Sequence, residues 1–394
     1  MMGLYIHIPF CAEKCTYCDF LSYDDKVSEW EDYKNALVND IVNLPKDEYD
    51  TIYIGGGTPT IWPSSYLDEL LSALPQTHPD AEITCEANPG TLTAEKIAVL
   101  AKRGVNRVSL GLQAWQPELL RAIGRKNEID GKSVADVFNE NYYALRNAGI
   151  DNINIDIMFA LPGQTINHWE ETLSKTCDLN PEHISAYALT LDEDSPIVAA
   201  DEETDRMMYH YLKSFVHSRG YRQYEISNFA KPGFESKHNI RYWTRKPYIG
   251  LGLGAHSFNQ NKRWHNITEL HNITERHNIA EGHNITERHN ITERHNITER
   301  HNITELHNIT EGIELTVITK EDAMAEFMYL GLRMTSGVVC AEFEKEFNIA
   351  LHEVYGSWIE KMINDGLLKK DTDCISLTDL GMDLANTVMT GFLS

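Results

Sequence analysis

Short apolar runs alternate with longer amphipathic stretches along the first half of the chain. The runs are rich in β-branched and aromatic residues and predict strands, which cover residues 4–10, 51–57, 82–88, 107–113, 152–159 and 183–190. The amphipathic stretches predict helices over residues 30–44, 66–74, 94–103 and 137–148. This alternation is typical of an α/β protein with a parallel sheet, and six strand–helix units fit a partial barrel or a doubly wound sheet. In either fold the chemistry lies at the carboxyl ends of the strands.

The pattern changes near the end of the chain. Helices are predicted over residues 320–333, 354–367 and 379–393, with a short polar hairpin over residues 368–377. This order is typical of a winged-helix-like α+β domain. Acidic residues outnumber basic ones within it, so a role in reading DNA is not expected.

Residues 265–312 differ from the rest, because they are eight tandem copies of one hexapeptide, His-Asn-Ile-(Thr/Ala)-Glu-(Arg/Leu/Gly). One large apolar residue in each copy gives a thin core, so we expect a flexible or weakly ordered low-complexity insertion. A β-solenoid, and a metal or heme role for the repeated histidines, stay open. The chain is therefore predicted to divide into residues 1–262, 263–312 and 313–394.

Composition narrows the class of protein. The 394 residues carry a formal charge of −24 and 42% of them are hydrophobic, which is ordinary for a globular protein apart from its acidity. The acidic excess disfavours partners such as nucleic acids, which need clustered Lys and Arg. No apolar run is long enough for a transmembrane helix, and the amino terminus lacks a secretory pattern, so a cytoplasmic location is expected. Seven cysteines, an odd number, argue against a disulfide framework.

Three of the cysteines form the strongest motif. Cys11, Cys15 and Cys18 follow the first predicted strand within eight residues of one another. Three thiolates on one loop can hold three irons of a cubane cluster and leave the fourth iron open to an exogenous ligand. A zinc site is the rival interpretation, but it usually needs a fourth ligand and paired cysteines. Three incidental thiols are the remaining alternative.

Polar residues and glycines end several predicted strands. Residues 55–57 are glycines followed by Thr58, and they allow a ligand close to the backbone with its N–H groups unobstructed, although a structural turn is equally consistent. Glu86 ends the third strand on its polar face, where it can accept from ribose hydroxyls or simply enter the next helix. Asp156 lies within an apolar strand and must be paired or face a polar pocket, and Arg125 is its predicted partner.

With its Cys-x-x-x-Cys-x-x-Cys spacing, the chain resembles the radical S-adenosylmethionine (SAM) superfamily. The resemblance implies a partial (β/α)6 barrel, in agreement with the six predicted strands. It also implies that the amine and carboxylate of SAM chelate the open iron of a [4Fe-4S] cluster, whose electron then releases a 5′-deoxyadenosyl radical.

Further motifs resemble one branch of that superfamily, the oxygen-independent coproporphyrinogen III oxidases and their relatives. They include Tyr5-Ile-His-Ile-Pro-Phe-Cys11, Glu86-Ala-Asn-Pro-Gly90 and Gly250-Leu-Gly-Leu-Gly254-Ala-His-Ser257. The oxidases carry a further cysteine where this chain has Phe20, and an extension before the first strand for which Cys11 leaves no room. Both departures favour the heme chaperones among these relatives, which share a His-Asn-x-x-Tyr-Trp motif.

The resemblance implies the site residues one by one. The cluster is assigned to Cys11, Cys15 and Cys18. SAM is assigned to Tyr5, the backbone at Tyr17, Gly57, Thr58, Glu86, Gln113, Arg125, Asp156 and Ala188. Heme is assigned to His238, Tyr242 and Trp243, because imidazole ligates heme iron and aromatic rings offer flat apolar surface. A structural aromatic corner with a capping histidine is the alternative for this last motif.

The predicted function is therefore a heme chaperone that binds a [4Fe-4S] cluster, SAM and heme and passes heme to acceptor hemoproteins. Because the protein is acidic and heme propionates are anionic, we expect iron ligation and aromatic contact to hold the heme. No nucleic acid partner is expected, membrane contact is expected only through an acceptor, and a homodimer is left open. An active coproporphyrinogen III oxidase and a heme or redox sensor are the alternatives, so enzymatic activity is also left open.

Overall fold

A computed structural model describes residues 1–191, 197–268, 270 and 314–393. Six strands form a continuous parallel sheet in which each strand pairs with the next one along the barrel. In sheet order they are β1 (Met2–Ile8), β2 (Tyr49–Gly56), β3 (Thr77–Ala87), β4 (Arg107–Gln113), β7 (Asn152–Phe159) and β8 (His183–Ala188). The prediction of an α/β protein with a partial (β/α)6 barrel is confirmed.

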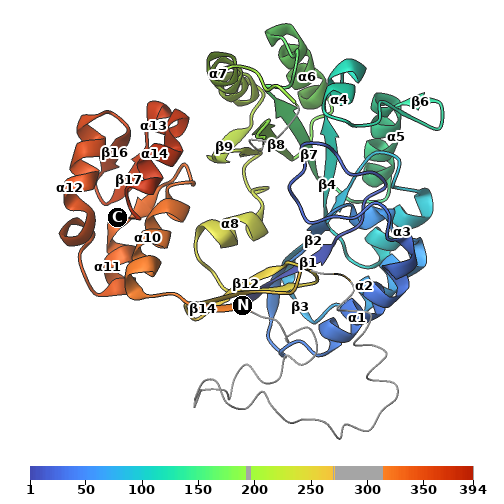
Figure 1. Cartoon of the computed structure of the whole chain (residues 1–394), viewed down its shortest axis with the longest axis horizontal. Helices are drawn as coiled ribbons and strands as arrows, with labels where there is room; N and C mark the ends of the chain where they lie inside the picture. The colour runs from blue at the N-terminus through green and yellow to red at the C-terminus, as the bar shows by residue number, and fades with distance from the viewer. Residues whose placement is uncertain (192–196, 269, 271–313, 394) are drawn as a thin grey trace, which may run out of the picture.

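Helices cover the outer face of this sheet (Figure 1). They are α1 (Trp30–Val42), α2 (Ser64–Ser72), α3 (Ala94–Lys102), α5 (Val134–Asn147), α6 (Ile166–Asp178) and α7 (Glu202–Ser218). Their apolar stripes, such as Leu37 and Ile41 on α1, are buried against the strands. Short elements complete the connections: the 3-10 turns η1 (Val27–Glu29) and η2 (Pro59–Ile61), α4 (Pro117–Ala122), and the hairpin β5 (Glu128–Ile129) and β6 (Lys132–Ser133). No helix among the described residues is long and apolar enough to cross a bilayer.

Further strands extend both edges of the parallel sheet, and none of them was predicted. Strand β11 (Tyr248–Leu251) pairs with β1 in parallel, and three antiparallel strands follow it. These are β12 (His256–Asn259), β13 (Lys262–His265) and β14 (Glu314–Val317). At the other edge, β10 (Asn228–Ala230) and β9 (Arg222–Glu225) follow β8.

The start of the hexapeptide array belongs to this sheet. His265, the first residue of the array, pairs with Glu314 in the β13–β14 ladder. The buried side-chain amide of Asn266 donates hydrogen bonds to the carbonyls of Gly250 (3.0 Å) and Gly252 (2.9 Å). The first copy is thus partly built into the fold, and the prediction of a flexible insertion for residues 271–312 lies outside the described residues.

The C-terminal segment forms a domain around its own cluster of buried apolar side chains. It contains α10 (Lys320–Gly331), β15 (Val338–Val339), α11 (Cys340–Phe347), α12 (Leu351–Asn364), β16 (Leu368–Asp371), β17 (Cys374–Leu377), α13 (Asp379–Asp383) and α14 (Ala385–Thr390). The single last helix predicted over residues 379–393 is wrong. The backbone leaves the helical region at Leu384 (φ −114°, ψ 28°), which divides the segment into α13 and α14.

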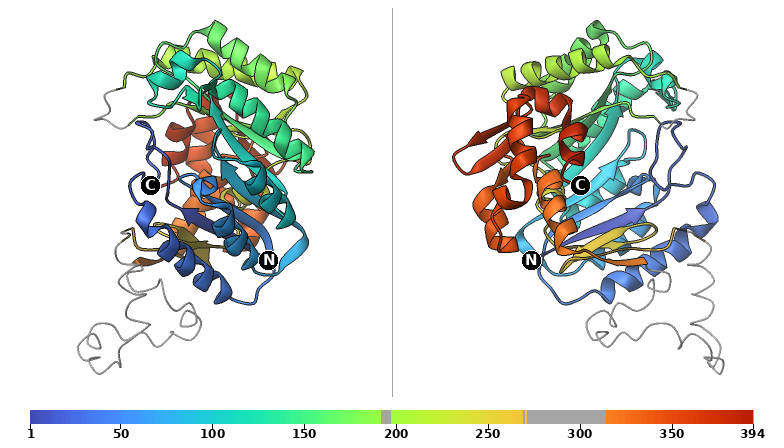
Figure 2. Two further views of the ribbon diagram at one scale, coloured as in Figure 1. Left: turned by 90° about the vertical axis from the view of Figure 1, so that its right-hand side faces the viewer. Right: turned by 60° about the vertical axis from the view of Figure 1, so that its left-hand side comes forward.

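One buried guanidinium connects this domain to the barrel. Arg245 follows α8 (Lys237–Trp243) and pairs with Glu326 on α10 (3.2 Å) and Glu346 on α11 (2.5 Å). Arg263 on β13 also pairs with Glu326 (2.7 Å). The side chains of Arg245 and Glu326 are almost wholly buried, so this network fixes the domain on the side of the barrel away from α1–α3 (Figures 1 and 2).

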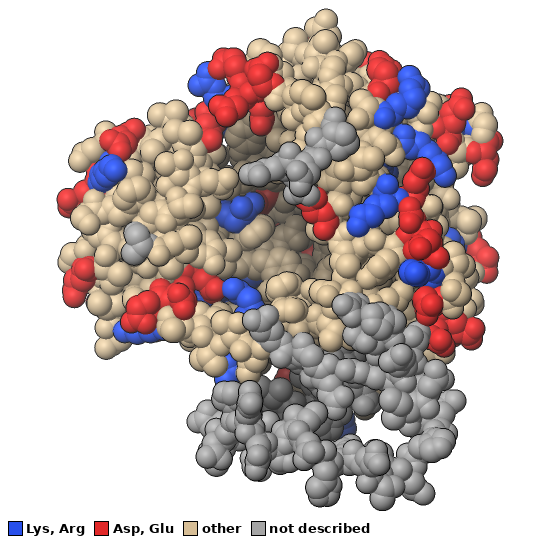
Figure 3. Space-filling view, viewed as in Figure 1, with Lys and Arg blue, Asp and Glu red and all other residues tan. Residues whose placement is uncertain are grey.

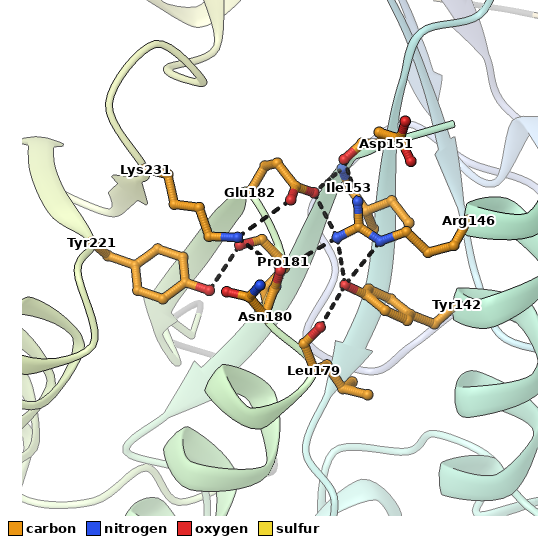
Figure 4. A network of polar contacts seen from close by, with 10 residues as sticks. All are labelled: Tyr142, Arg146, Asp151, Ile153, Leu179, Asn180, Pro181, Glu182, Tyr221 and Lys231. Carbon is orange, nitrogen blue, oxygen red and sulfur yellow. Dashed lines mark hydrogen bonds and ion pairs between the residues drawn. The ribbon is translucent and has the colours of Figure 1, made fainter. Parts of the chain in front are cut away.

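A second network ties the amino-terminal ends of the strands together. Glu182, just before β8, pairs with Arg146 at the end of α5 (2.6 Å) and with Lys231 after β10 (3.3 Å), and it accepts from the N–H of Ile153 on β7 (3.3 Å). Arg146 also donates to the hydroxyl of Tyr142 (Figure 4). These contacts lie at the opposite end of the strands from the motifs that carry chemistry.

Candidate functional site

The three cysteines lie on the loop that follows β1. The N–H of Cys11 donates to the carbonyl of Tyr23 (3.0 Å), and the N–H of Cys18 donates to the carbonyl of Cys15 (3.2 Å). All three thiols are free of disulfide bonds and partly exposed. Burial, with a smaller contribution from neighbouring thiols, raises the pKa of Cys11 and that of Cys18. The loop therefore presents three reduced thiols beside the carboxyl ends of the strands.

The surroundings of these thiols fit an iron–sulfur cluster. The hydroxyl of Thr58 donates to Sγ of Cys11 (3.8 Å), and the Arg125 guanidinium lies near enough to Cys15 for their charges to interact. Within the part of the chain that the structure describes, no group of three or more His, Cys, Asp or Glu side chains is arranged to hold a metal ion. The donor set, with three thiols and a nearby cation, nevertheless matches what a cluster with thiolate ligands requires.

The glycine-rich loop after β2 packs directly on the end of β1. The N–H groups of Gly57 and Thr58 donate to the carbonyls of Ile8 (2.9 Å) and Phe10 (2.7 Å). A Cβ atom on Gly57 would lie 2.5 Å from the Phe10 carbonyl oxygen, so only glycine permits this approach. The expectation of unobstructed N–H groups is therefore wrong at these two positions. The ammonium group of SAM is itself a hydrogen-bond donor. This loop can therefore bind it only through the oxygen atoms of the loop.

Glu86 lies on β3 facing the same loop. It accepts hydrogen bonds from the hydroxyl of Tyr53 (2.7 Å) and from the N–H of Gly56 (3.2 Å). Burial raises the pKa of Glu86 to about 7, against the opposing effect of the Tyr53 hydrogen bond. Raised carboxyl pKa values occur at functional sites, and burial alone also produces them elsewhere in a protein.

Asn88 joins elements far apart in the sequence, and it was not among the predicted ligands. Its amide donates to the hydroxyl of Thr58 (2.8 Å), and its carbonyl oxygen accepts from Arg125 (3.0 Å). Arg125 also donates to the hydroxyl of Tyr17 (3.4 Å) on the cysteine loop. The alternation that puts Glu86 on the polar face of its strand also puts Asn88 there, which was the available signal.

Asp156 lies on β7 in a polar cluster of its own. It accepts hydrogen bonds from the hydroxyl of Ser109 (3.0 Å) and from the amide of Asn154 (2.7 Å), and burial raises its pKa. The predicted ion pair between Asp156 and Arg125 is wrong, because the described residues show none between them. The hydroxyl of Ser109 on the neighbouring strand β4 and the amide of Asn154 on β7 itself satisfy this carboxylate instead.

The remaining predicted SAM contacts lie on the same strands. Gln113 ends β4 in the left-handed region, with a φ of 69°, and such positions cluster at functional sites. The hydroxyl of Tyr5 on β1 lies 2.9 Å from Nδ1 of His7. Ala188 is the last residue of β8, opposite Phe159 of β7. The structure thus brings side chains from six strands and the cysteine loop to one end of the barrel.

His238, the predicted heme ligand, is fully buried in α8. Its Nδ1 lies 2.9 Å from the hydroxyl of Thr51, and its Nε2 lies 2.8 Å from the hydroxyl of Tyr242. Burial lowers the pKa of His238 to about 3. Both ring nitrogens are engaged, which is the structural corner that the sequence left as the alternative. Iron ligation by His238 requires one of these hydrogen bonds to break.

The other two heme candidates face different neighbours. The ring of Trp243 lies under the guanidinium of Arg333 of the C-terminal domain, 4.3 Å from its centre. Tyr242 lines an open hollow of about 390 Å³ beside β1, together with Phe20 and His256. Within the His-Asn-x-x-Tyr-Trp motif, Tyr242 therefore belongs to a surface hollow and Trp243 to the contact between domains.

Comparison with known proteins identifies the family of the chain. The profile described as the radical SAM superfamily matches residues 5–176, and that of the HemN C-terminal domain matches residues 318–384. The protein named heme chaperone HemW from Lactococcus lactis subsp. lactis is 34% identical over 99% of this chain and 96% of its own length. The chain belongs to the HemW family. The protein of the same name from Bacillus subtilis is 33% identical over 100% of this chain and 99% of its own.

A solved structure shares the fold. The coproporphyrinogen III oxidase HemN of Escherichia coli, described as a radical SAM enzyme, superposes with a TM-score of 0.78 over 99% of this chain and 89% of that one. At 19% sequence identity, this likeness shows the fold of this HemW-family chain and nothing about its activity. The predicted resemblance is confirmed, and membership of a radical SAM family implies a [4Fe-4S] cluster and SAM.

Proposed function

We propose that this protein is a heme chaperone that carries a [4Fe-4S] cluster and SAM and delivers heme to acceptor hemoproteins. The observation that carries the proposal is the similarity to a heme chaperone over nearly the whole of both chains. The chain has Phe20 where the oxidases are expected to carry a further cysteine, which also favours the chaperone. A cytoplasmic location and a division into residues 1–262, 263–312 and 313–394 are part of the same proposal.

The cofactor roles follow the contacts at the carboxyl ends of the strands. Cys11, Cys15 and Cys18 hold the cluster, which supplies the iron that SAM chelates. Glu86 accepts from the ribose hydroxyls of SAM, and Arg125, held by Asn88, contributes a positive charge beside the cluster loop. The further SAM contacts proposed are Tyr5, the backbone at Tyr17, Gly57, Thr58, Gln113, Asp156 and Ala188.

The surface charge supports a partner other than nucleic acid. Figure 3 shows acidic and basic side chains scattered over one face of the described residues, with no continuous basic patch there. Sequence-independent nucleic acid binding depends on such a patch. Binding of heme, which is mostly apolar, and of a hemoprotein that accepts it does not depend on a basic patch.

One anaerobic preparation tests the proposal. The reconstituted protein is expected to contain four irons and to lose them in Cys15→Ala, while Cys374→Ala, a cysteine on the C-terminal domain, keeps them. The intact protein is expected to bind heme and to convert an apo-hemoprotein to its heme-bound form, measured by absorption.

Incubation with coproporphyrinogen III, SAM and a reductant separates the alternatives. Formation of protoporphyrinogen IX would establish the oxidase and overturn the chaperone. Heme binding without any transfer to an acceptor would favour the sensor.

A further inference from the structure

Three histidines lie at or next to the hollow beside β1, and they differ in what their ring nitrogens contact. His7 is engaged at both nitrogens, by the hydroxyl of Tyr5 (2.9 Å) and by the carbonyl of Leu21 (2.9 Å). His238 is engaged at both as described above. His256 is exposed, its ring lies beside that of His265 with 5.3 Å between ring centres, and among the described residues no hydrogen bond involves its ring. It is therefore the histidine of the three whose lone pair is available to a metal.

We propose that heme binds in this hollow and that the imidazole of His256 ligates its iron, while His238 positions Tyr242 against the macrocycle. This inference rests on the proposed function and adds to it the site and the iron ligand. His256 belongs to the Gly-Leu-Gly-Leu-Gly-Ala-His-Ser segment, whose role the SAM site leaves unexplained.

The lining of the hollow suits a flat apolar ligand. It presents the aromatic side chains of Tyr5, Phe20, Tyr242 and Tyr248, and its apolar part includes Leu253. Phe20 is 67% exposed, so its ring is accessible to a ligand. Its volume, about 390 Å³, is in the range of small-molecule sites. Aromatic rings at an open hollow provide the face contacts that a porphyrin needs.

The glycine-rich segment fixes the position of His256 at the rim. A Cβ on Gly250 would lie 2.2 Å from the carbonyl oxygen of His256, so a larger residue there would displace β12. The N–H of Gly250 donates to the buried hydroxyl of Ser257 (2.9 Å). The amide of Asn266 ties the carbonyls of Gly250 and Gly252 together. The imidazole is therefore presented from a rigid backbone, as a preorganised ligand should be.

His238 acts on the same hollow through Tyr242. Its Nε2 holds the Tyr242 hydroxyl at 2.8 Å, and the Tyr242 ring meets the edge of Tyr248 with 4.7 Å between ring centres. The start of α8 is itself anchored, because Glu82 accepts from the N–H of His238 (3.1 Å). His238 is thus a positioning residue, and its effect on heme is expected to pass through the orientation of an aromatic ring.

The test is a heme titration of the full-length protein, followed by absorption and electron paramagnetic resonance. In His256→Ala the spectral signature of imidazole ligation is expected to disappear and the Kd for heme to rise about tenfold or more, and added imidazole is expected to restore the signature. His217→Ala, which removes an exposed histidine on α7, serves as the matched control and should change neither. Tyr242→Phe keeps the ring but removes the bond to His238, and it should retain the signature with a smaller loss of affinity.

The outcomes distinguish this inference from the proposed function. If the signature survives in His256→Ala and is lost in a folded His238→Ala, the assignment of the ligand is overturned while the chaperone function stands. If the unaltered protein binds no heme, both fail together. Circular dichroism of each variant establishes that it is folded.

Discussion

At the residue scale, the half-buried Glu86 and the buried Asp40 have carboxyl pKa values that are raised for the same reason, and they lie in different parts of the molecule. Burial raises the pKa of Glu86 to about 7 and that of Asp40 on α1 to about 8. One oxygen of Asp40 is buried without a hydrogen-bond partner among the described residues. Glu86 lies at the proposed SAM site, whereas Asp40 lies on the outer helix layer. Substitution of Asp40 therefore reports only the effect of a carboxylate on stability. Substitution of Glu86 reports that effect together with any effect on SAM binding.

We predict that Glu86→Gln stabilises the cofactor-free protein above pH 7 and weakens SAM binding at the same time. The pKa of Glu86 is higher in the folded than in the unfolded chain, so its contribution to stability is greatest below about pH 4.5, is lost as the pH rises to about 7, and is absent above. The gain in the free energy of unfolding is expected to be roughly 1–3 kcal/mol at pH 8 and close to zero at pH 4. Thermal melts at both pH values and SAM titration measure the two effects.

Asp40→Asn is the control for this prediction. It should show a similar pH-dependent gain in stability with unchanged affinity for SAM. A Glu86→Gln protein that binds SAM as tightly as the original would remove Glu86 from the site.

At the element scale, the two ends of the strands carry different tasks. The carboxyl ends bear the cysteine loop, Glu86 and Asp156, whereas the amino ends bear the charge network around Glu182 (Figure 4). In barrels of this kind, polar residues at the amino ends generally serve stability. The network joins α5, β7, β8 and β10, so it holds the barrel together far from the site.

Glu182→Gln is predicted to lower the free energy of unfolding by about 2–4 kcal/mol, because Arg146 and Lys231 lose their common anion in a largely buried place. SAM affinity should not change. Urea denaturation and SAM titration are the measurements.

The matched control is Glu140→Gln, which removes an exposed pair with Lys132 and should cost less than about 1 kcal/mol. Equal losses in the two variants would show that the network around Glu182 has no special role.

The sequence was sufficient to predict the elements that have a repeated or amphipathic pattern of apolar residues. It predicted few of the other elements. The six parallel strands and their helices were predictable because buried apolar runs alternate with amphipathic stretches. Strands β9–β14 were not, because they are short and contain polar residues and glycines, and only pairing with a distant strand makes them extended. Helix α11 and the break at Leu384 likewise depend on packing within the C-terminal domain.

The candidate site was predictable as a set of strand ends but not as a set of contacts. Strand alternation placed Glu86 on the polar face of β3, and the apolar run around Asp156 placed that residue within β7. Asn154, two residues earlier on the same strand, could have been named as a partner of Asp156, but Ser109 could not, because its place beside Asp156 depends on the register of β4 and β7. The arrangement around His238 depends in the same way on Thr51, which is distant in sequence.

At the scale of the whole molecule, the sheet continues across the hexapeptide array. Strands β13 and β14 pair across it, and Arg263 on β13 makes one of the contacts to the C-terminal domain. Asn266, within the first copy, holds the glycine segment that presents His256. We therefore expect the first copy of the hexapeptide to matter for stability and heme affinity more than the later copies do.

We predict that deletion of residues 271–312, which joins Leu270 to residue 313, leaves heme affinity unchanged and shifts the melting temperature by only a few degrees, because a shorter closed loop has a small entropic effect. Asn266→Ala, in contrast, removes a buried donor from the carbonyls of Gly250 and Gly252, although Gly252 keeps its bond from the N–H of Ala255 (3.3 Å), and should cost about 1–3 kcal/mol. Calorimetry and heme titration of both proteins provide the comparison. Loss of heme binding in the deletion protein would assign a function to the later copies.

The register of β13 and β14 also bears on how the gene can change. Because residue 265 lies directly opposite residue 314, a chain segment of any length between them leaves and re-enters the protein at one place. Doubling such a segment adds only about 0.6 kcal/mol of loop-closure free energy. In-frame gain or loss of repeat units during replication is therefore expected to change the free energy of unfolding of the folded domains very little. Lineages that carry this protein are expected to differ in the number of copies while keeping the first one.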